Sequence, residues 1–96
     1  MTDLSLGEKK YTVSIEYCVP CDYSSTAFRV TAELLSHYQH VIDNLVLITG
    51  TKGVFEVNVN DKPIFSKRVL KRQPRPGEVL QSFQELVGPN ISPYPR

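Results

Sequence analysis

The chain has 96 residues, of which 41% are apolar and 22% charged, and its formal net charge is +1 at pH 7. This balance is ordinary for one small globular domain and argues against a disordered chain. A net charge this close to zero gives no electrostatic reason to expect nucleic acid or a membrane as a partner.

The cysteine count and the N-terminal sequence indicate a cellular compartment. Two cysteines are too few for a secreted disulfide scaffold. Residues 1–8 lack the basic and hydrophobic regions of a secretory signal, and the longest apolar run, 45–48, is too short to span a bilayer. We therefore expect a cytoplasmic protein whose cysteines cycle between thiol and disulfide.

The folded domain is expected to begin with a strand and a helix. Residues 11–17 alternate between apolar and polar side chains, as a strand with one buried face does. Residues 22–40 follow a helical period, with Arg29 and Glu33 on the face away from the core. The apolar stripe of this helix is expected to consist of Ala27, Phe28, Thr31, Leu34, Leu35 and Tyr38.

Three further strands follow. Residues 45–48 predict a strand that is apolar on both faces. Residues 54–59 and 64–66 predict a hairpin, because Asn60-Asp61 between them is typical of a turn. Pro63 cannot donate a hydrogen bond to a neighbouring strand, so it places the second hairpin strand at a sheet edge.

A basic loop and a second helix complete the domain. Residues 68–75 predict the loop, and the helix is expected to open at Pro76-Gly77-Glu78 and to end at Gly88. Its apolar stripe consists of Val79, Leu80, Phe83, Leu86 and Val87. The whole chain then divides into a flexible N-terminus over 1–9, one domain over 10–88 and a proline-rich tail over 89–96.

The element order is thus β-α-β-β-β-α, with a parallel β-α-β unit followed by an antiparallel hairpin. This order resembles the minimal core of a thioredoxin-like fold, a two-layer α/β (α+β) domain. Its four-stranded mixed sheet would carry two helices on one face and leave the other face bare. Because the strand at 45–48 is apolar on both sides and would lie at an edge, we expect a homo-oligomer or a protein partner on the uncovered face.

Cys18 and Cys21 lie where the first strand gives way to the helix. The first turn of a helix brings residues i and i+3 within disulfide distance, and its free N–H groups favour a thiolate. Pro20 is expected to start that helix. A Cys-x-x-Cys at such a place is typical of thiol–disulfide redox chemistry.

Exchange needs one thiolate to attack and a second thiol to resolve the mixed disulfide. Because Cys18 precedes the helix, we expect it to be the more exposed cysteine and to attack, while Cys21 resolves. Inert core thiols are the alternative, which this spacing beside a proline disfavours.

Zinc is a competing interpretation, since Cys18, Cys21, His37 and His40 fall near zinc-finger spacing. In one continuous helix, however, Cys21 and His37 would lie about 24 Å apart along the axis, too far to share an ion. We therefore expect no metal and no cofactor.

A basic cluster could dock an acidic partner or a glutathione carboxylate, or could be a solvated loop. It consists of Lys67, Arg68, Lys71, Arg72 and Arg75.

Two segments carry a resemblance to a known family. Residues 13–21, V-S-I-E-Y-C-V-P-C, resemble the redox motif of the selenoprotein W (Rdx) family, and the hairpin over 53–67 resembles its second marker. The resemblance covers roughly residues 11–88. It implies a small thioredoxin-like protein with a redox-active pair at Cys18 and Cys21, acting in antioxidant or thiol-exchange pathways.

Two features differ from related patterns. In the selenoproteins the position of Cys21 holds selenocysteine, so the resemblance favours Cys21, not Cys18, as the more reactive residue. Residues 51–53, Thr-Lys-Gly, stand where a typical thioredoxin has a cis-proline. The expected partners are protein thiols and disulfides, and glutathione. The alternative function is a non-catalytic interaction module that senses redox state through the same motif.

Overall fold

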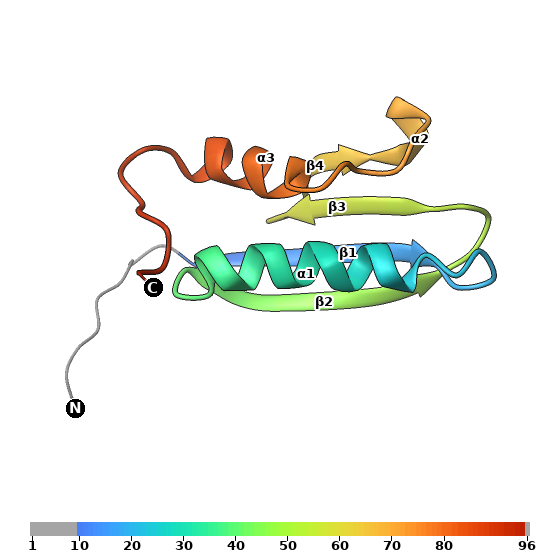
Figure 1. The fold of residues 1–96 in the computed structure, drawn as a ribbon, viewed down its shortest axis with the longest axis horizontal. Helices are drawn as coiled ribbons and strands as arrows, with labels where there is room; N and C mark the ends of the chain where they lie inside the picture. Colours follow the sequence, from blue (N-terminus) through green and yellow to red (C-terminus); the bar gives the residue numbers. More distant parts are fainter. Residues whose placement is uncertain (1–9, 96) are drawn as a thin grey trace.

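The domain is built on one sheet in which β1 is central (Figure 1). β1 (Tyr11–Cys18) pairs in parallel with β2 (Ile42–Gly50) and antiparallel with β3 (Phe55–Val59). β4 (Lys62–Ser66) pairs antiparallel with β3, so the strand order is β2-β1-β3-β4. The predicted four-stranded mixed sheet is confirmed, with β2 and β4, which contains Pro63, as its edges.

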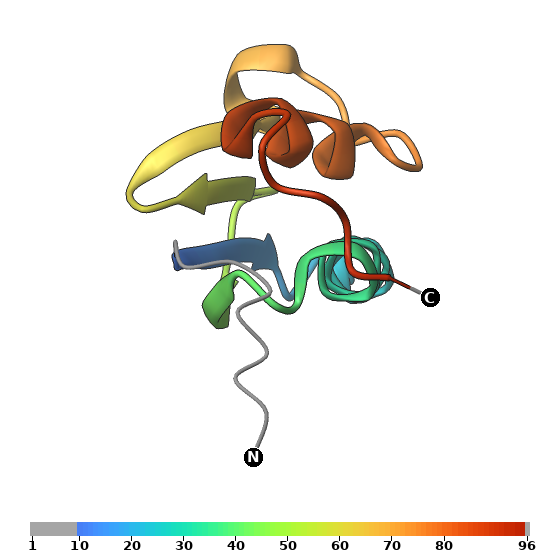
Figure 2. The same ribbon diagram turned by 90° about the vertical axis from the view of Figure 1, so that its left-hand side faces the viewer.

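The computed structural model describes residues 10–95, so the predicted flexible N-terminus, 1–9, lies outside the described residues. Within them, α1 (Ser24–Tyr38) connects β1 to β2, and α3 (Glu78–Val87) follows β4. The two helices lie on the same face of the sheet, as predicted (Figures 1 and 2). No helix in the described part of the chain is long and apolar enough to cross a membrane.

One short helix, α2 (Lys67–Leu70), stands where the sequence predicted the start of a basic loop. The Ser66 hydroxyl accepts a hydrogen bond from the N–H of Val69, which caps the first turn. Lys71 adopts a left-handed conformation that ends the helix after one turn. The expectation of a loop was therefore wrong for residues 68–70, where the cap supplied by Ser66 stabilises one helical turn.

The core lies between the sheet and the two long helices. On the predicted inward face of the first strand, Val13 and Ile15 are fully buried, whereas Tyr17 is partly buried. The stripe predicted for α1 was rotated: Phe28 is 57% exposed, whereas Val30, which the prediction left out, is fully buried. The buried side chains of α1 are Ala27, Val30, Leu34 and Tyr38.

The rotation of α1 follows from contacts with the segment before α3. The guanidinium of Arg29 donates to the carbonyl oxygen of Pro74 at 2.8 Å, and Glu33 accepts from the N–H of Gly77 at 3.0 Å. These two residues were expected to face solvent, but α3 and its entry loop pack beside them. The face of α1 that points to the sheet is therefore set by tertiary contacts on its flank.

The sheet face opposite the helices is polar at its centre. The pairing register matches Ser14 and Glu16 of β1 with Val46 and Ile48 of β2, so these four side chains share that face. Val46 is 47% exposed and Ile48 is 41% exposed. The apolar surface on the uncovered face thus belongs to the edge strand β2, not to the middle of the sheet.

The homo-oligomer stays a prediction, and Val46 and Ile48 are the residues that test it. If copies associate through this edge, light scattering of the concentrated wild type should give a mass above that of one chain. Val46→Lys should return it to the monomer, because a charge in an apolar contact is costly to desolvate. A wild type that stays monomeric at high concentration would contradict the prediction.

An ion pair fixes the loop before α3 to the start of that helix. Both guanidinium nitrogens of Arg72 donate to Glu78 at 2.7 Å, and the N–H of Arg75 donates to the same carboxylate at 2.9 Å. The hydrogen bonds from Arg72 and then from Arg75 lower the pKa of Glu78 from its usual 4.5 to about 2. Glu78 therefore stabilises the fold in its ionised form.

Glu78→Gln should destabilise the protein at neutral pH by about 1 kcal/mol, the range for a partly exposed charge-assisted pair. Because the folded-state pKa is depressed, this contribution is complete above about pH 4.5 and is lost as the pH falls towards 2. Urea unfolding of wild type and variant should therefore converge across that window. Glu85→Gln, an exposed change on the same helix, is the control expected to have little effect. A gap between wild type and Glu78→Gln that did not narrow in acid would contradict this account.

Candidate redox site

The Cys-x-x-Cys motif lies in a pair of turns ahead of α1. Cys18 is the last residue of β1, and α1 begins at Ser24. The carbonyl oxygen of Val19 accepts from the N–H of Asp22 at 2.8 Å, and that of Cys18 accepts from Tyr23 at 3.1 Å. The expectation that the first helical turn contains Cys21 was therefore wrong.

The late start of α1 has a backbone cause. Asp22 has a φ of 57°, in the left-handed region that a right-handed helix cannot include. Pro20 instead occupies the second position of the turn from Val19 to Asp22, where its fixed φ fits a β-turn. The prediction that Pro20 starts the helix was wrong for this reason.

A disulfide joins Cys18 to Cys21, with the Cα atoms 5.3 Å apart, inside the usual range for such a bond. The N–H of Cys21 also donates to the Sγ atom of Cys18 at 3.3 Å. The turn thus places both sulfur atoms in contact without help from the helix geometry that the sequence suggested.

The exposure of the two cysteines is the reverse of the prediction. Cys18 is fully buried, whereas Cys21 is exposed at the turn. Cys18 still belongs to the sheet: its N–H donates to the carbonyl oxygen of Val54 at 2.9 Å. Because β1 continues to Cys18 and the chain leaves the sheet only afterwards, the first cysteine is held inside and the second is presented to solvent.

The residues at the two ends of the turn between β2 and β3 form backbone hydrogen bonds with the motif. The N–H of Val19 donates to Gly50 at 3.0 Å, next to the bond between Cys18 and Val54. A Cβ atom at Gly50 would lie 2.8 Å from a methyl of Val54 and 2.9 Å from the carboxylate of Glu16, so only glycine fits here without a shift. Residues 51–53 lie between Gly50 and Val54, the two residues of this turn that bond the motif.

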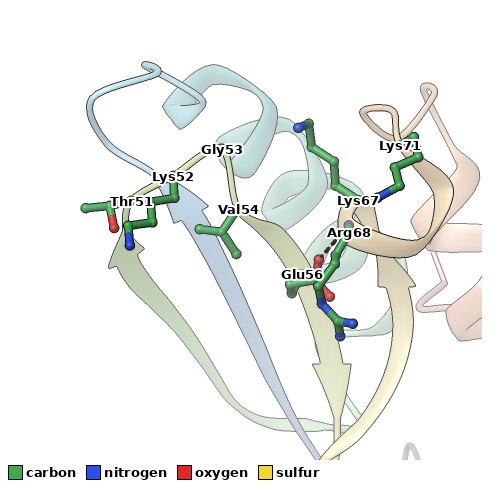
Figure 3. Close-up of a pocket in the computed structure, with 8 residues that line it drawn as sticks. All are labelled: Thr51, Lys52, Gly53, Val54, Glu56, Lys67, Arg68 and Lys71. Atoms are coloured by element: carbon green, nitrogen blue, oxygen red, sulfur yellow. Dashed lines mark hydrogen bonds between the residues drawn. The ribbon is translucent and has the colours of Figure 1, made fainter.

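A pocket of about 380 Å³ opens between this turn and α2 (Figure 3). Its residues come from three segments: the β2–β3 turn, β3 and α2. They are Thr51, Lys52, Gly53, Val54, Glu56, Lys67, Arg68 and Lys71. The Nζ atom of Lys67 lies 5.6 Å from the ring centroid of Tyr23, a cation–π contact that ties the pocket to the motif turn.

The basic cluster predicted from the sequence is divided in two. Lys67, Arg68 and Lys71 line the pocket, whereas the side chain of Arg72 and the backbone N–H of Arg75 bind Glu78. Lys52 is a pocket residue that sequence reasoning missed. Its only signal is its place in the turn after β2, which the sheet topology brings opposite α2.

The two histidines lie far from the motif in the fold. His37 is in the last turn of α1 and its Nδ1 atom bonds the carbonyl oxygen of Glu33 at 2.9 Å, while His40 bonds the carbonyl oxygen of Ser92 at 2.9 Å. Across residues 10–95, no group of three or more His, Cys, Asp or Glu side chains is placed to hold a metal ion.

Known proteins share this sequence pattern and this fold. Residues 12–85 match the sequence model of the Rdx family. The structure is similar to that of a selenoprotein W-related protein from Vibrio cholerae, with a TM-score of 0.78 and 24% identity over 83% of this chain and 100% of that chain. It is also similar to a protein from Bordetella parapertussis, with a TM-score of 0.73 and 26% identity over 80% of this chain and 98% of that chain. No curated protein matches the sequence of this chain. Because the family model spans most of the chain, including both cysteines and the hairpin, the chain belongs to the Rdx family.

Proposed function

We propose that the protein exchanges disulfides with protein thiols through Cys18 and Cys21, in antioxidant or thiol-exchange pathways of the cytoplasm. The observation that carries the proposal is the asymmetry of the pair: Cys18 is fully buried at a strand end, whereas Cys21 is an exposed residue on a turn. Thiol–disulfide exchange needs this division, because one sulfur must meet the substrate and the other must resolve the intermediate.

In the oxidised protein the Sγ atom of the exposed residue Cys21 is the sulfur that a substrate thiolate can reach. The attack of the substrate thiolate forms a bond between the substrate sulfur and Cys21. It breaks the Cys18–Cys21 bond and so releases a Cys18 thiolate. A second substrate thiolate then attacks the substrate sulfur of the mixed disulfide and releases Cys21. The substrate gains a disulfide and loses two electrons, and the protein becomes a dithiol.

The reverse direction uses the same geometry. The Cys21 thiolate attacks a substrate disulfide, and buried Cys18 then resolves the mixed disulfide. This order differs from the one that the sequence position of Cys18 suggested and agrees with the family resemblance. The N–H of Cys21 already donates to the Cys18 sulfur at 3.3 Å, and a hydrogen bond of this kind stabilises the Cys18 thiolate that attacks the mixed disulfide.

A redox-sensing interaction module is the second candidate function. Val19, between the cysteines, is 49% exposed, which would suit contact with a protein surface that depends on the state of the turn. A sensor would form and lose its disulfide without passing it to a substrate. Repeated turnover with a protein disulfide distinguishes the two functions.

A matched pair of variants tests the order of attack. Reduced Cys18→Ser should accumulate mixed disulfides on Cys21, because the resolving thiol is missing, whereas reduced Cys21→Ser should accumulate few. In the reduced wild type, iodoacetamide should alkylate Cys21 at least about tenfold faster than buried Cys18, as read by peptide mass spectrometry.

Two different outcomes would contradict the order of attack and the exchange function. Mixed disulfides that collect on Cys21→Ser would assign the attack to Cys18 and overturn the order. Two thiols that never pair in a series of glutathione buffers would overturn exchange itself.

A further inference from the structure

The pocket between the β2–β3 turn and α2 concentrates positive charge that the rest of the protein balances. Four of its side chains, those of Lys52, Lys67, Arg68 and Lys71, are cationic. Glu56 is its one carboxylate, and that group accepts the backbone N–H of Arg68 at 3.1 Å. The whole chain has a net charge of only +1, so this excess is local.

Among the described residues none of the four cations takes part in an ion pair, and Lys67 also contacts the ring of Tyr23. The ion pairs found among residues 10–95 join Arg29 to Glu33 and Arg72 to Glu78, and neither involves a pocket residue. The close-up shows the pocket lysines on two separate segments, Lys52 on the β2–β3 turn and Lys67 and Lys71 on the side of α2, and Lys67 is directed towards the turn that carries Tyr23 (Figure 3). Unpaired cations around a concave surface raise the local concentration of anions.

The pocket lies next to the motif turn, the turn over residues 18–23 that carries the two cysteines. Val54 lines the pocket and accepts the N–H of Cys18, while Lys67 contacts the ring of Tyr23 at the end of the motif turn. The motif turn, the β2–β3 turn and α2 all lie at one end of the molecule (Figure 1). A molecule whose disulfide reaches Cys21 would therefore present its neighbouring groups to these lysines.

The chemistry of the pocket favours an acidic peptide segment. Lysine ammonium groups are separate point charges that each pair with one carboxylate, and here they come from the β2–β3 turn and from α2. Exposed apolar side chains stand beside them, Val69 and Leu70 on α2 and Val19 in the motif. A polypeptide that carries several carboxylates along its length can use both kinds of contact.

We propose that this pocket selects protein disulfides whose cysteine is flanked by acidic residues. The inference rests on the proposed exchange function and adds a substrate class to it. The cations would speed the encounter and orient the substrate cysteine towards Cys21, while the sulfur chemistry would remain that of the cysteine pair.

Three synthetic peptides provide the probe. Each carries one cysteine joined by a disulfide to 2-thiopyridine, and its flanking residues are aspartate, serine or lysine. The Cys21 thiolate of the reduced protein attacks the peptide sulfur and releases pyridine-2-thione, which is followed by its absorbance. Cys18 then attacks Cys21 and releases the peptide as a thiol, so the protein ends as the disulfide.

The acidic peptide should react about tenfold faster than the serine peptide at low salt, and the lysine peptide should react more slowly than both. The preference should shrink as salt rises, because the charges are exposed to solvent. Replacing Lys52, Lys67 and Lys71 together by Gln should remove most of this preference, measured as the ratio of the rate with the acidic peptide to the rate with the serine peptide.

Lys62→Gln is the matched control, since Lys62 is exposed at the hairpin turn, where β4 begins. It should keep the preference for the acidic peptide. Equal rates for all three peptides, or a preference that survives the triple change, would overturn the pocket proposal and leave exchange intact. A preference lost to the same extent in Lys62→Gln would assign it to net charge and overturn the pocket as well. Failure of all three peptides to release pyridine-2-thione would instead overturn the exchange function.

Glutathione also carries carboxylates, so a further experiment compares glutathione with an acidic peptide as the substrate. Oxidised glutathione and an acidic peptide dimerised through its cysteine are compared as substrates at equal concentration. The proposal expects the peptide to react faster and to lose more rate in the triple variant. If glutathione reacted as fast and depended equally on the lysines, selection of a peptide would be wrong.

Discussion

The structure depends on the central place of β1, which has hydrogen-bonding partners on both sides as far as its last residue. At that end Cys18 bonds Val54, and the next residue, Val19, bonds Gly50. The two neighbouring strands are joined by the turn over 51–54, so the end of β1 and this turn hold each other in place. The motif turn begins at this end of β1, and the cationic pocket lies beside the turn over 51–54.

Much of the fold could be predicted because the decisive signals are local. Strict alternation over 11–17 and 54–59 identifies β1 and β3, and Pro63 identifies an edge. β2 is longer than the run at 45–48 because pairing with β1, not side-chain character, defines its ends. On α1, Phe28 and Val30 are both apolar, and only packing against α3 decides which one is buried.

The site was harder to predict, since its arrangement depends on one backbone angle and on contacts distant in sequence. Pro20 resembles a helix start, but the left-handed conformation of Asp22 delays the helix and changes which cysteine is exposed. The motif itself, and the pairing of Cys18 with Cys21, could be recognised from the spacing together with its place at the end of a strand. Lys52 could not, because nothing near it in the sequence connects it to α2.

The two sulfur atoms belong to parts of the chain with different local stability. Cys18 is held by the central strand, whose backbone bonds open only when the sheet itself opens, whereas Cys21 lies in a short turn secured by two backbone hydrogen bonds. In the proposed exchange, opening of the disulfide would change the freedom of the turn and leave the sheet in register. Repeated cycles would then not require any part of the core to refold.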